Sequence, residues 1–187
     1  GGDGPAEEWV LRMAPVPAAD FLDAMAAREG LAPPMLDAMA DAVAAMHAAA
    51  PRAETDPPAV MASILEGNIP SARRAGLDPA RVEAWAAAAR AELARVAPVL
   101  AARGAAGFVR RCHGDLHLAN LCLIDGRPTP FDALEFDEAL ARIDVGYDLA
   151  FLLMDLDLRL GRAAANRVLN RYVARTGDAG LLAGLPL

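Results

Sequence analysis

A short β-hairpin within an otherwise helical sequence is the feature that most constrains how this chain can fold. The dipeptide Asp125-Gly126 is the strongest local signal for a tight hairpin turn, and it separates two short segments, Leu121–Ile124 and Thr129–Phe131. A hairpin brings the chain back to where it began, so Asp132 should lie near the residues that precede Leu121. The sequence therefore predicts that the hairpin delivers Asp132, twelve residues after Asn120, to the segment that precedes the hairpin.

Most of the remaining chain shows the spacing of apolar residues that is typical of amphipathic helices. One such stripe consists of Leu36, Met39, Val43 and Met46. We expect helices to begin near Asp20, Pro33, Met61, Pro79, Asp144 and Ala163, and further short strands at Glu8–Met13 and Phe108–Cys112. Pro98 should kink or end the helix in which it lies, and Trp9 and Trp85 are expected in the core. The predicted fold class is α+β, predominantly helical.

The basic residues exclude some kinds of chemistry, because all 18 of them are arginine. A chain without lysine has no Walker P-loop lysine, no Schiff base and no lysine clamp on a nucleotide phosphate. The net charge of −7 without a basic cluster argues against nucleic-acid binding. No apolar run reaches the ~18 residues of a membrane helix, no signal peptide is evident, and Cys112 and Cys122 are expected to be reduced. These features predict a cytoplasmic protein.

The negative charge is concentrated in one segment, from His113 to Asp157. This segment contains only two arginines, Arg127 and Arg142, and its ten acidic residues are Asp115, Asp125, Asp132, Glu135, Asp137, Glu138, Asp144, Asp148, Asp155 and Asp157. The rest of the chain is almost balanced, with 15 acidic residues and 16 arginines. A solvated acidic surface would explain part of this pattern. Carboxylates gathered around a hairpin also suit a hard divalent cation, which prefers oxygen ligands.

The acidic segment opens with HGDLHLAN, residues 113–120, in which the spacing is His-x-Asp-x-x-x-x-Asn. Phosphoryl transfer needs a carboxylate that accepts the proton of the substrate hydroxyl, and an amide oxygen that reaches Mg²⁺ on the nucleotide phosphates. A second carboxylate, from a neighbouring strand, completes the metal site. Asp115, Asn120 and Asp132 fit these three positions in that order.

HGDLHLAN, the hairpin, FDALEF and IDVGYDLAFLL together resemble the C-terminal lobe of the aminoglycoside phosphotransferase family, over roughly residues 108–160. The resemblance implies a protein-kinase-like C-terminal lobe with a small catalytic β-hairpin. It also implies ATP or GTP as phosphoryl donor, Mg²⁺ as cofactor and a small hydroxyl-bearing substrate. The segment from Phe131 to Asp157 is most similar to a bacterial subgroup in which such a domain precedes a separate P-loop ATPase domain.

The same resemblance implies roles for individual residues. Asp115 matches the catalytic base, Asn120 and Asp132 match the metal ligands, His113 matches a residue that braces the loop, and Asp148 matches an aspartate that ties a helix start to that loop. Relatives usually have about a dozen residues between the metal carboxylate and that aspartate. Here the separation is 16 residues from Asp132 and 13 from Glu135, so Glu135 stays open as a second ligand or an alternative, and Asp137 as a weaker one.

For each of two residues near the motif, two interpretations remain open. His117 either approaches the substrate or phosphate, or is structural. Arg142 either pairs with acidic residues of its own segment or senses phosphate. We expect His47 to be a structural histidine at a helix end, and Asp155 and Asp157 to be solvated or to cap backbone groups.

The resemblance also implies a division of the chain. Residues 1–17 would hold a strand and a hinge-like linker left from an N-terminal lobe, with adenine near Met13 and Ala14. Residues 18–187 would form the C-terminal lobe, with the catalytic loop and metal hairpin at 108–137. We expect a chain truncated at both ends that has little or no transferase activity alone. Its missing N-terminal lobe would carry the strand lysine that kinases of this fold pair with a helix glutamate, unless arginine replaces that lysine. A C-terminal P-loop domain is a further expected partner.

Two other functions remain open from the sequence. A non-catalytic kinase-like module could keep the same acidic residues as structure. A metallohydrolase could use His113-x-Asp115-x-His117, although catalytic zinc usually has three protein ligands and this chain has only three histidines.

Overall fold

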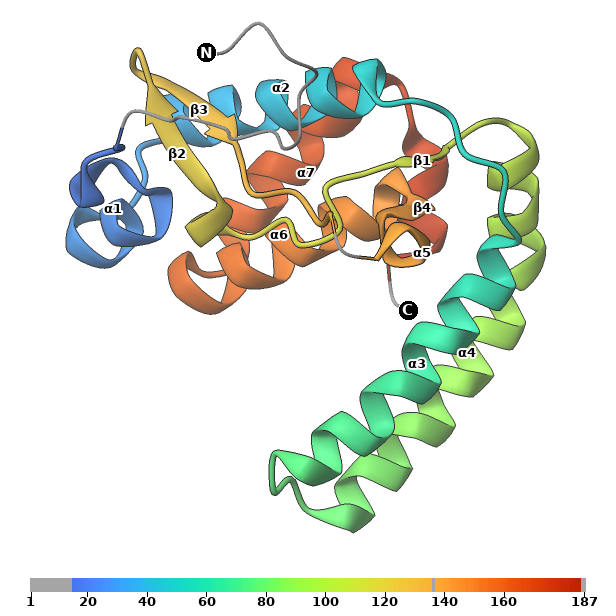
Figure 1. The fold of residues 1–187 in the computed structure, drawn as a ribbon. Coiled ribbons are helices and arrows are strands. Elements are labelled where there is room, and N and C mark those ends of the chain that lie inside the picture. Colours follow the sequence, from blue (N-terminus) through green and yellow to red (C-terminus); the bar gives the residue numbers. More distant parts are fainter. Residues whose placement is uncertain (1–14, 136, 186–187) are drawn as a thin grey trace, which may run out of the picture.

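The fold is known from a computed structural model that describes residues 15–135 and 137–185 (Figure 1). Its helices are α1 (Leu22–Glu29), α2 (Pro33–Ala49), α3 (Pro57–Arg74), α4 (Pro79–Ala105), α5 (Glu138–Ala141), α6 (Val145–Leu160) and α7 (Arg162–Thr176). Its strands are β1 (Val109–Arg111), β2 (Leu121–Ile124), β3 (Arg127–Pro130) and β4 (Arg142–Asp144). Short 3₁₀ turns lie at Ala18–Asp20, Leu118–Asn120 and Ala179–Ala183. The expected α+β, predominantly helical fold class is confirmed.

The strands form two small antiparallel pairs, β2 with β3 and β1 with β4. Asp125 and Gly126 both have positive φ, 51° and 73°, which is the backbone that a tight two-residue hairpin turn requires. The hairpin is therefore confirmed as a structural element, with Leu121 opposite Pro130. Its second strand begins at Arg127, two residues earlier than the sequence predicts, because pairing continues up to the turn.

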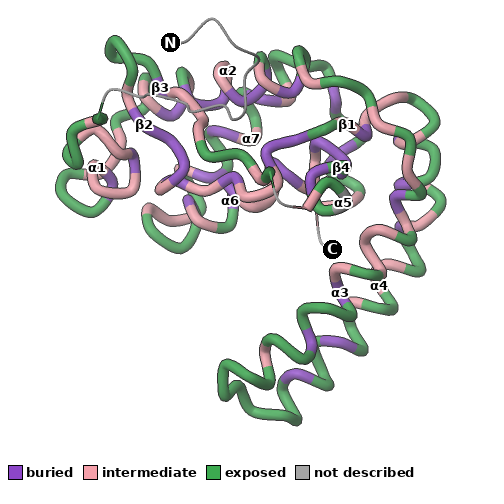
Figure 2. Tube along the Cα trace, viewed as in Figure 1, coloured by how far each residue is buried: buried purple, intermediate pink, exposed green. Residues whose placement is uncertain are grey.

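The main core lies between α2, α6 and α7, with α1 and the hairpin against one end (Figures 1 and 2). The predicted stripe of α2 is largely confirmed, since Leu36, Met39 and Val43 are buried. Opposite them, α6 and α7 bury a second group of apolar side chains, namely Leu149, Leu152, Leu156, Val168 and Tyr172. These three helices form the rigid base on which the candidate site is built.

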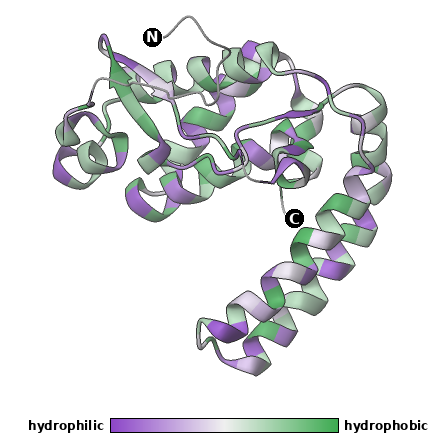
Figure 3. Ribbon diagram, in the orientation of Figure 1, coloured by the Kyte–Doolittle hydropathy of each residue, from purple (hydrophilic) through white to green (hydrophobic). Residues whose placement is uncertain are grey.

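Helices α3 and α4 form an antiparallel arm that extends away from this body (Figure 1). Hydrophilic and weakly hydrophobic residues alternate along both helices (Figure 3), and only a narrow facing strip is buried (Figure 2). Near the tip that strip consists of Ile69, Val82 and Ala86. Trp85 is 45% exposed, so its expected place in the core is wrong. A two-helix arm covers only the side of α4 that faces α3, and Trp85 lies outside that side.

Pro98 lies inside α4 and does not end the helix. Proline removes one backbone hydrogen bond, but the flanking alanines favour helix strongly. Val96 and Leu100, on either side of Pro98, are buried and hold both parts in place. The helix therefore continues to Ala105.

Among the helices that the structure describes, none combines the length and the apolarity needed to span a bilayer. The strand expected at Glu8–Met13, the hinge at Met13 and Ala14, and Trp9 lie outside the described residues.

Candidate active site

The loop between β1 and β2 carries the HGDLHLAN motif, and a glycine makes its first turn. Gly114 has φ of 81°, a backbone that side chains rarely adopt. A Cβ atom added at Gly114 would lie 3.0 Å from the Cβ of Leu134. A side chain at residue 114 would therefore have to displace Leu134, so glycine favours the close approach of the loop and the segment after the hairpin.

A buried carboxylate on α6 holds the beginning of this loop. One oxygen of Asp148 accepts hydrogen bonds from the backbone N–H of His113 (3.0 Å) and lies 3.0 Å from Nε2 of His47. The other oxygen accepts from the backbone N–H of Gly114 at 2.9 Å. Asp148 is 1% exposed, so these contacts replace its hydration almost completely.

His47, at the end of α2, is the second buried partner in this group. Its Nδ1 lies 2.8 Å from the hydroxyl of Tyr172 on α7, which closes a chain from Tyr172 through His47 to Asp148. Burial raises the pKa of the Tyr172 hydroxyl, so this side chain stays neutral. The structural interpretation of His47 is consistent with these contacts.

The motif residues Asp115, His117 and Asn120 lie together at the other end of the loop. The amide nitrogen of Asn120 donates to the backbone oxygen (2.9 Å) and to a side-chain oxygen (3.1 Å) of Asp115. This leaves the amide oxygen of Asn120 as the atom that can serve as a metal ligand. Nε2 of His117 lies 3.4 Å from the same carboxylate, whose side chain is 48% exposed and open to a substrate.

Three hydrogen bonds join the segment after the hairpin to this loop. The N–H of Phe131 donates to the backbone oxygen of Asn120 (3.1 Å), and the N–H of Leu134 donates to the backbone oxygen of His113 (2.8 Å). Nε2 of His113 lies 2.8 Å from the backbone oxygen of Phe131. Asp132 is thus held between two anchored residues, in a left-handed backbone conformation with φ of 58°. Aspartate tolerates this conformation better than most residues other than glycine, as Asp125 also shows in the hairpin turn.

The remaining candidates are Glu135, as a second metal carboxylate, and Arg142, as a phosphate sensor. Glu135 and Asp132 are both exposed, one on each side of the anchored Leu134. Arg142, on β4, forms an ion pair of 3.3 Å with Glu138, which also binds Arg111. The hydrogen bond from Arg111 is the main cause that lowers the pKa of Glu138. Of the two interpretations of Arg142, this contact favours pairing with an acidic residue of its own segment.

The metallohydrolase arrangement gains no support among the described residues. The ring of His113 is directed at Phe131, and the only described group that gathers metal-ligating atoms closely is a different one, His47, Cys112 and Asp148. In that group the hydrogen bonds described above already engage His47 and Asp148. Burial raises the pKa of the Cys112 thiol, which opposes the thiolate that a metal would need.

Three further residues support the site: Asp155, which the sequence predicts to be solvated or to cap backbone groups, Asp144 at a predicted helix start, and Arg103, which sequence reasoning missed. Asp155 accepts a hydrogen bond of 3.0 Å from the backbone N–H of Leu118, and so fixes the far end of the loop. Asp144 caps the start of α6 by accepting from the N–H of Gly146 at 2.7 Å, and Arg103 binds Asp144 through two hydrogen bonds. The spacing of seven between Asp148 and Asp155 is a signal that both face one side of a helix. No local signal pairs Arg103 with Asp144, because 41 residues separate them.

A family model described as the phosphotransferase enzyme family matches residues 2–183. Three curated mycobacterial proteins are each 38% identical over 66 residues: the uncharacterized proteins Mb2027c of Mycobacterium bovis, and MT2060 and Rv2004c of Mycobacterium tuberculosis. The match spans 35% of this chain and 13% of the length of these relatives.

Proposed function

Since the chain belongs to the phosphotransferase enzyme family, we propose that the protein is a kinase that moves the γ-phosphoryl group of ATP or GTP to a hydroxyl group of a small molecule. The proposal depends most on one observation. The loop and the segment after the hairpin are joined through His113 and Asn120, and Asn120 binds Asp115, which supports a shared site for Asp115, Asn120 and Asp132. Phosphoryl transfer is achieved mainly by such positioning.

Asp115 is the proposed catalytic base. The acceptor oxygen forms a bond to the γ-phosphorus while the bond from that phosphorus to the β,γ-bridging oxygen breaks. The hydroxyl proton passes to the carboxylate of Asp115, and the products are a phosphomonoester and ADP or GDP. The contact from Asn120 restrains the rotation of this carboxylate, while its exposure leaves room for the acceptor.

Asn120 and Asp132 are the proposed ligands of Mg²⁺, with Glu135 as a second ligand or an alternative. The donor set fits this ion, because it consists of one amide oxygen and carboxylate oxygens without thiolate or imidazole. When bound, Mg²⁺ would neutralise negative charge on the nucleotide phosphates. His113 positions the segment that carries Asp132, and Asp148 positions the loop.

Two neighbouring residues complete the proposal. His117 is 33% exposed beside Asp115, and we place it next to the substrate or the transferred phosphate. Arg142 is bound to Glu138 and would reach phosphate only by leaving this partner. Because the chain contains no lysine, arginine or residues outside these 187 would have to hold the nucleotide phosphates.

The experiment compares Asp115→Asn with Asp125→Asn in the full-length protein, supplied with Mg²⁺, ATP or GTP and a panel of alcohols. The first variant removes the base with little change of shape, and we expect its rate to fall about 10²–10⁴-fold. Asp125 lies in the turn of the same hairpin, where asparagine tolerates the left-handed backbone, so Asp125→Asn should retain the wild-type rate. Full activity of Asp115→Asn would refute the proposal. Mg²⁺-dependent nucleotide binding without transfer would instead favour a non-catalytic module.

A further inference from the structure

Helix α6 presents an apolar surface directly beside the candidate catalytic loop. Asp148 and Asp155 face the loop, because both accept hydrogen bonds from its backbone. The helical repeat places Phe151 and Leu158 only about 40° and 60° from Asp155 around the helix axis, and Met154 about 100° away. Leu158 is 85% exposed and Met154 is 59% exposed. A substrate that reaches Asp115 therefore has an apolar stripe of α6 next to it.

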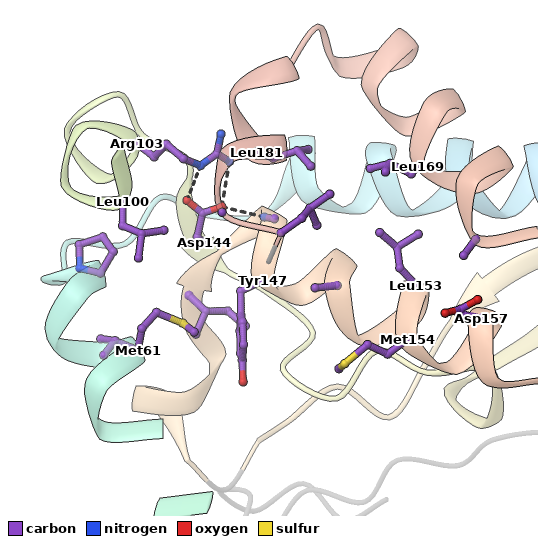
Figure 4. A pocket seen from close by; sticks show the side chains of 18 of the residues that line it. Met61, Leu100, Arg103, Asp144, Tyr147, Leu153, Met154, Asp157, Leu169 and Leu181 are labelled. Atoms are coloured by element: carbon purple, nitrogen blue, oxygen red, sulfur yellow. Dashed lines mark hydrogen bonds and ion pairs between the residues drawn. The ribbon is translucent and has the colours of Figure 1, made fainter. Parts of the chain in front are cut away.

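This stripe continues into a cavity that has a volume of about 510 Å³ and lies between α3, α6, α7 and the last 3₁₀ turn. Figure 4 shows Tyr147 between Met61 of α3 and Met154 of α6 at one side of this cavity, and Leu153 and Leu169 also line it. Such a volume and apolar lining are typical of small-molecule sites.

The charged groups around the cavity and the stripe are largely paired with other protein groups. Arg103 and Asp144, at one end of the cavity, bind each other (Figure 4). Asp155, beside the stripe, accepts from Leu118 and from Arg159 at 2.6 Å. Asp157 is the remaining carboxylate of the cavity wall, on the opposite side of α6 from the loop. Within the cavity itself, a polycationic ligand would find two carboxylates, Asp157 and the Asp144 that Arg103 binds, and no larger cluster among the described residues.

We propose that the acceptor is an elongated, uncharged alcohol with an apolar body. Its body lies in the cavity between Met61, Tyr147 and Leu153, its middle crosses Met154 and Phe151, and its hydroxyl reaches Asp115. The helix that separates the two ends is about 10 Å across, so a very short alcohol fills only one end of this path. This inference rests on the proposed phosphotransferase function and assigns its acceptor.

The first test measures kcat/KM of the full-length protein with ATP, Mg²⁺ and a series of primary alcohols, from 2-phenylethanol to 6-phenyl-1-hexanol. We expect kcat/KM to rise about fourfold for each added methylene until the cavity is filled, since burying one methylene contributes about 0.8 kcal/mol. Kanamycin, a polycationic alcohol, should be a poor acceptor. A rate that does not depend on chain length, or faster transfer to kanamycin, would overturn the inference and leave the phosphotransferase function intact.

The second test measures binding without turnover, by equilibrium dialysis of the full-length protein against 2-(2-naphthyl)ethanol. We expect Met154→Glu to weaken binding at least tenfold. Leu77→Glu is the matched control, because Leu77 is 58% exposed at the tip of the arm and far from α6, and this variant should bind like the wild type. Equal binding by all three proteins would overturn the inference. If binding depended on Met154 but the protein transferred phosphate to no acceptor, the phosphotransferase function would be refuted. The cavity would then bind the alcohol without being an acceptor site.

Discussion

At the scale of single residues, Asp148 connects the core to the candidate catalytic loop. It accepts two backbone hydrogen bonds from the loop and contacts His47, whose other ring nitrogen contacts Tyr172. Through these contacts, residues of α2, α6 and α7 together hold His113 and Gly114 in place. The loop geometry therefore depends on a carboxylate that touches no substrate in the proposed reaction.

We expect Asp148→Asn to lower both stability and activity. Asparagine keeps the shape but turns one acceptor oxygen into an NH₂ group, which would face a backbone N–H or the ring of His47. An unsatisfied buried polar group lowers the free energy of unfolding by about 1–3 kcal/mol, which urea unfolding would measure. Asp157→Asn, on the exposed side of the same helix, should change it by less than about 0.5 kcal/mol. Equal effects of the two variants would contradict the role of Asp148.

Gly114 provides a second prediction at this scale. Gly114→Ala would combine a left-handed backbone, which disfavours alanine by about 1–2 kcal/mol, with a contact of 3.0 Å to the Cβ of Leu134. Gly177→Ala is the matched control, because Gly177 has φ of 71° and open space around its missing Cβ. We expect transferase activity to fall at least tenfold more in Gly114→Ala than in Gly177→Ala. Similar activity of both variants would show that the close approach of the loop and Leu134 is unimportant.

At the scale of elements, α2 and α7 are held together by ion pairs on their exposed edges, two of them bidentate and a third, between Arg175 and Asp41, at 3.3 Å. Arg167 binds Asp37, and Arg171 binds Asp41, each through two hydrogen bonds of 2.7 and 2.8 Å. The hydrogen bond from its arginine is the main cause that lowers the pKa of each aspartate below 3.8. The side chains of the two bidentate pairs are 30–45% exposed, so solvent weakens both pairs.

These pairs predict a difference in acid stability. A carboxylate whose pKa is lowered by folding stabilises the folded state above its unfolded pKa, and this contribution disappears as the pH falls through the folded pKa. We expect the double variant Arg167→Gln, Arg171→Gln to be less stable than the wild type by a constant amount from pH 7 to pH 5. The difference should shrink below about pH 4 and vanish at lower pH, in thermal unfolding followed by circular dichroism. A difference that does not change on acidification would contradict this assignment.

Elements defined by local sequence could be predicted, and those defined by distant contacts could not. The Asp125-Gly126 turn and the apolar stripe of α2 are local signals, and both elements are present. Strand β4 has only three residues and pairs with β1, more than 30 positions earlier, so its own sequence carries no signal. Of the two effects predicted for Pro98, the end of α4 does not occur, because packing on both sides outweighs one lost hydrogen bond. In the candidate site the spacing of HGDLHLAN grouped Asp115 and Asn120, whereas the contact between His47 and Asp148 spans 101 positions.

At the scale of the whole molecule, Arg103 joins three parts that are far apart in the sequence. It lies in the last turn of α4, where the arm meets the body, and it binds Asp144 at the start of α6 and Asp178 just after α7. All three side chains are buried. One guanidinium therefore compensates two buried carboxylates, and the same group forms one end of the proposed acceptor cavity.

This arrangement predicts that Arg103→Met is among the most destabilising single changes in the chain. Methionine retains much of the volume but leaves Asp144 and Asp178 buried, close together and without a cation. Breaking a buried ion pair lowers the free energy of unfolding by about 3–5 kcal/mol. Arg95→Met, eight residues earlier on α4, removes an exposed pair with Glu92 and should lower it by at most about 1 kcal/mol. The triple variant Arg103→Met, Asp144→Asn, Asp178→Asn removes the uncompensated charges and should recover part of the loss. If urea unfolding gave the triple variant no more stability than Arg103→Met, the loss would come from packing of the arginine side chain rather than from charge.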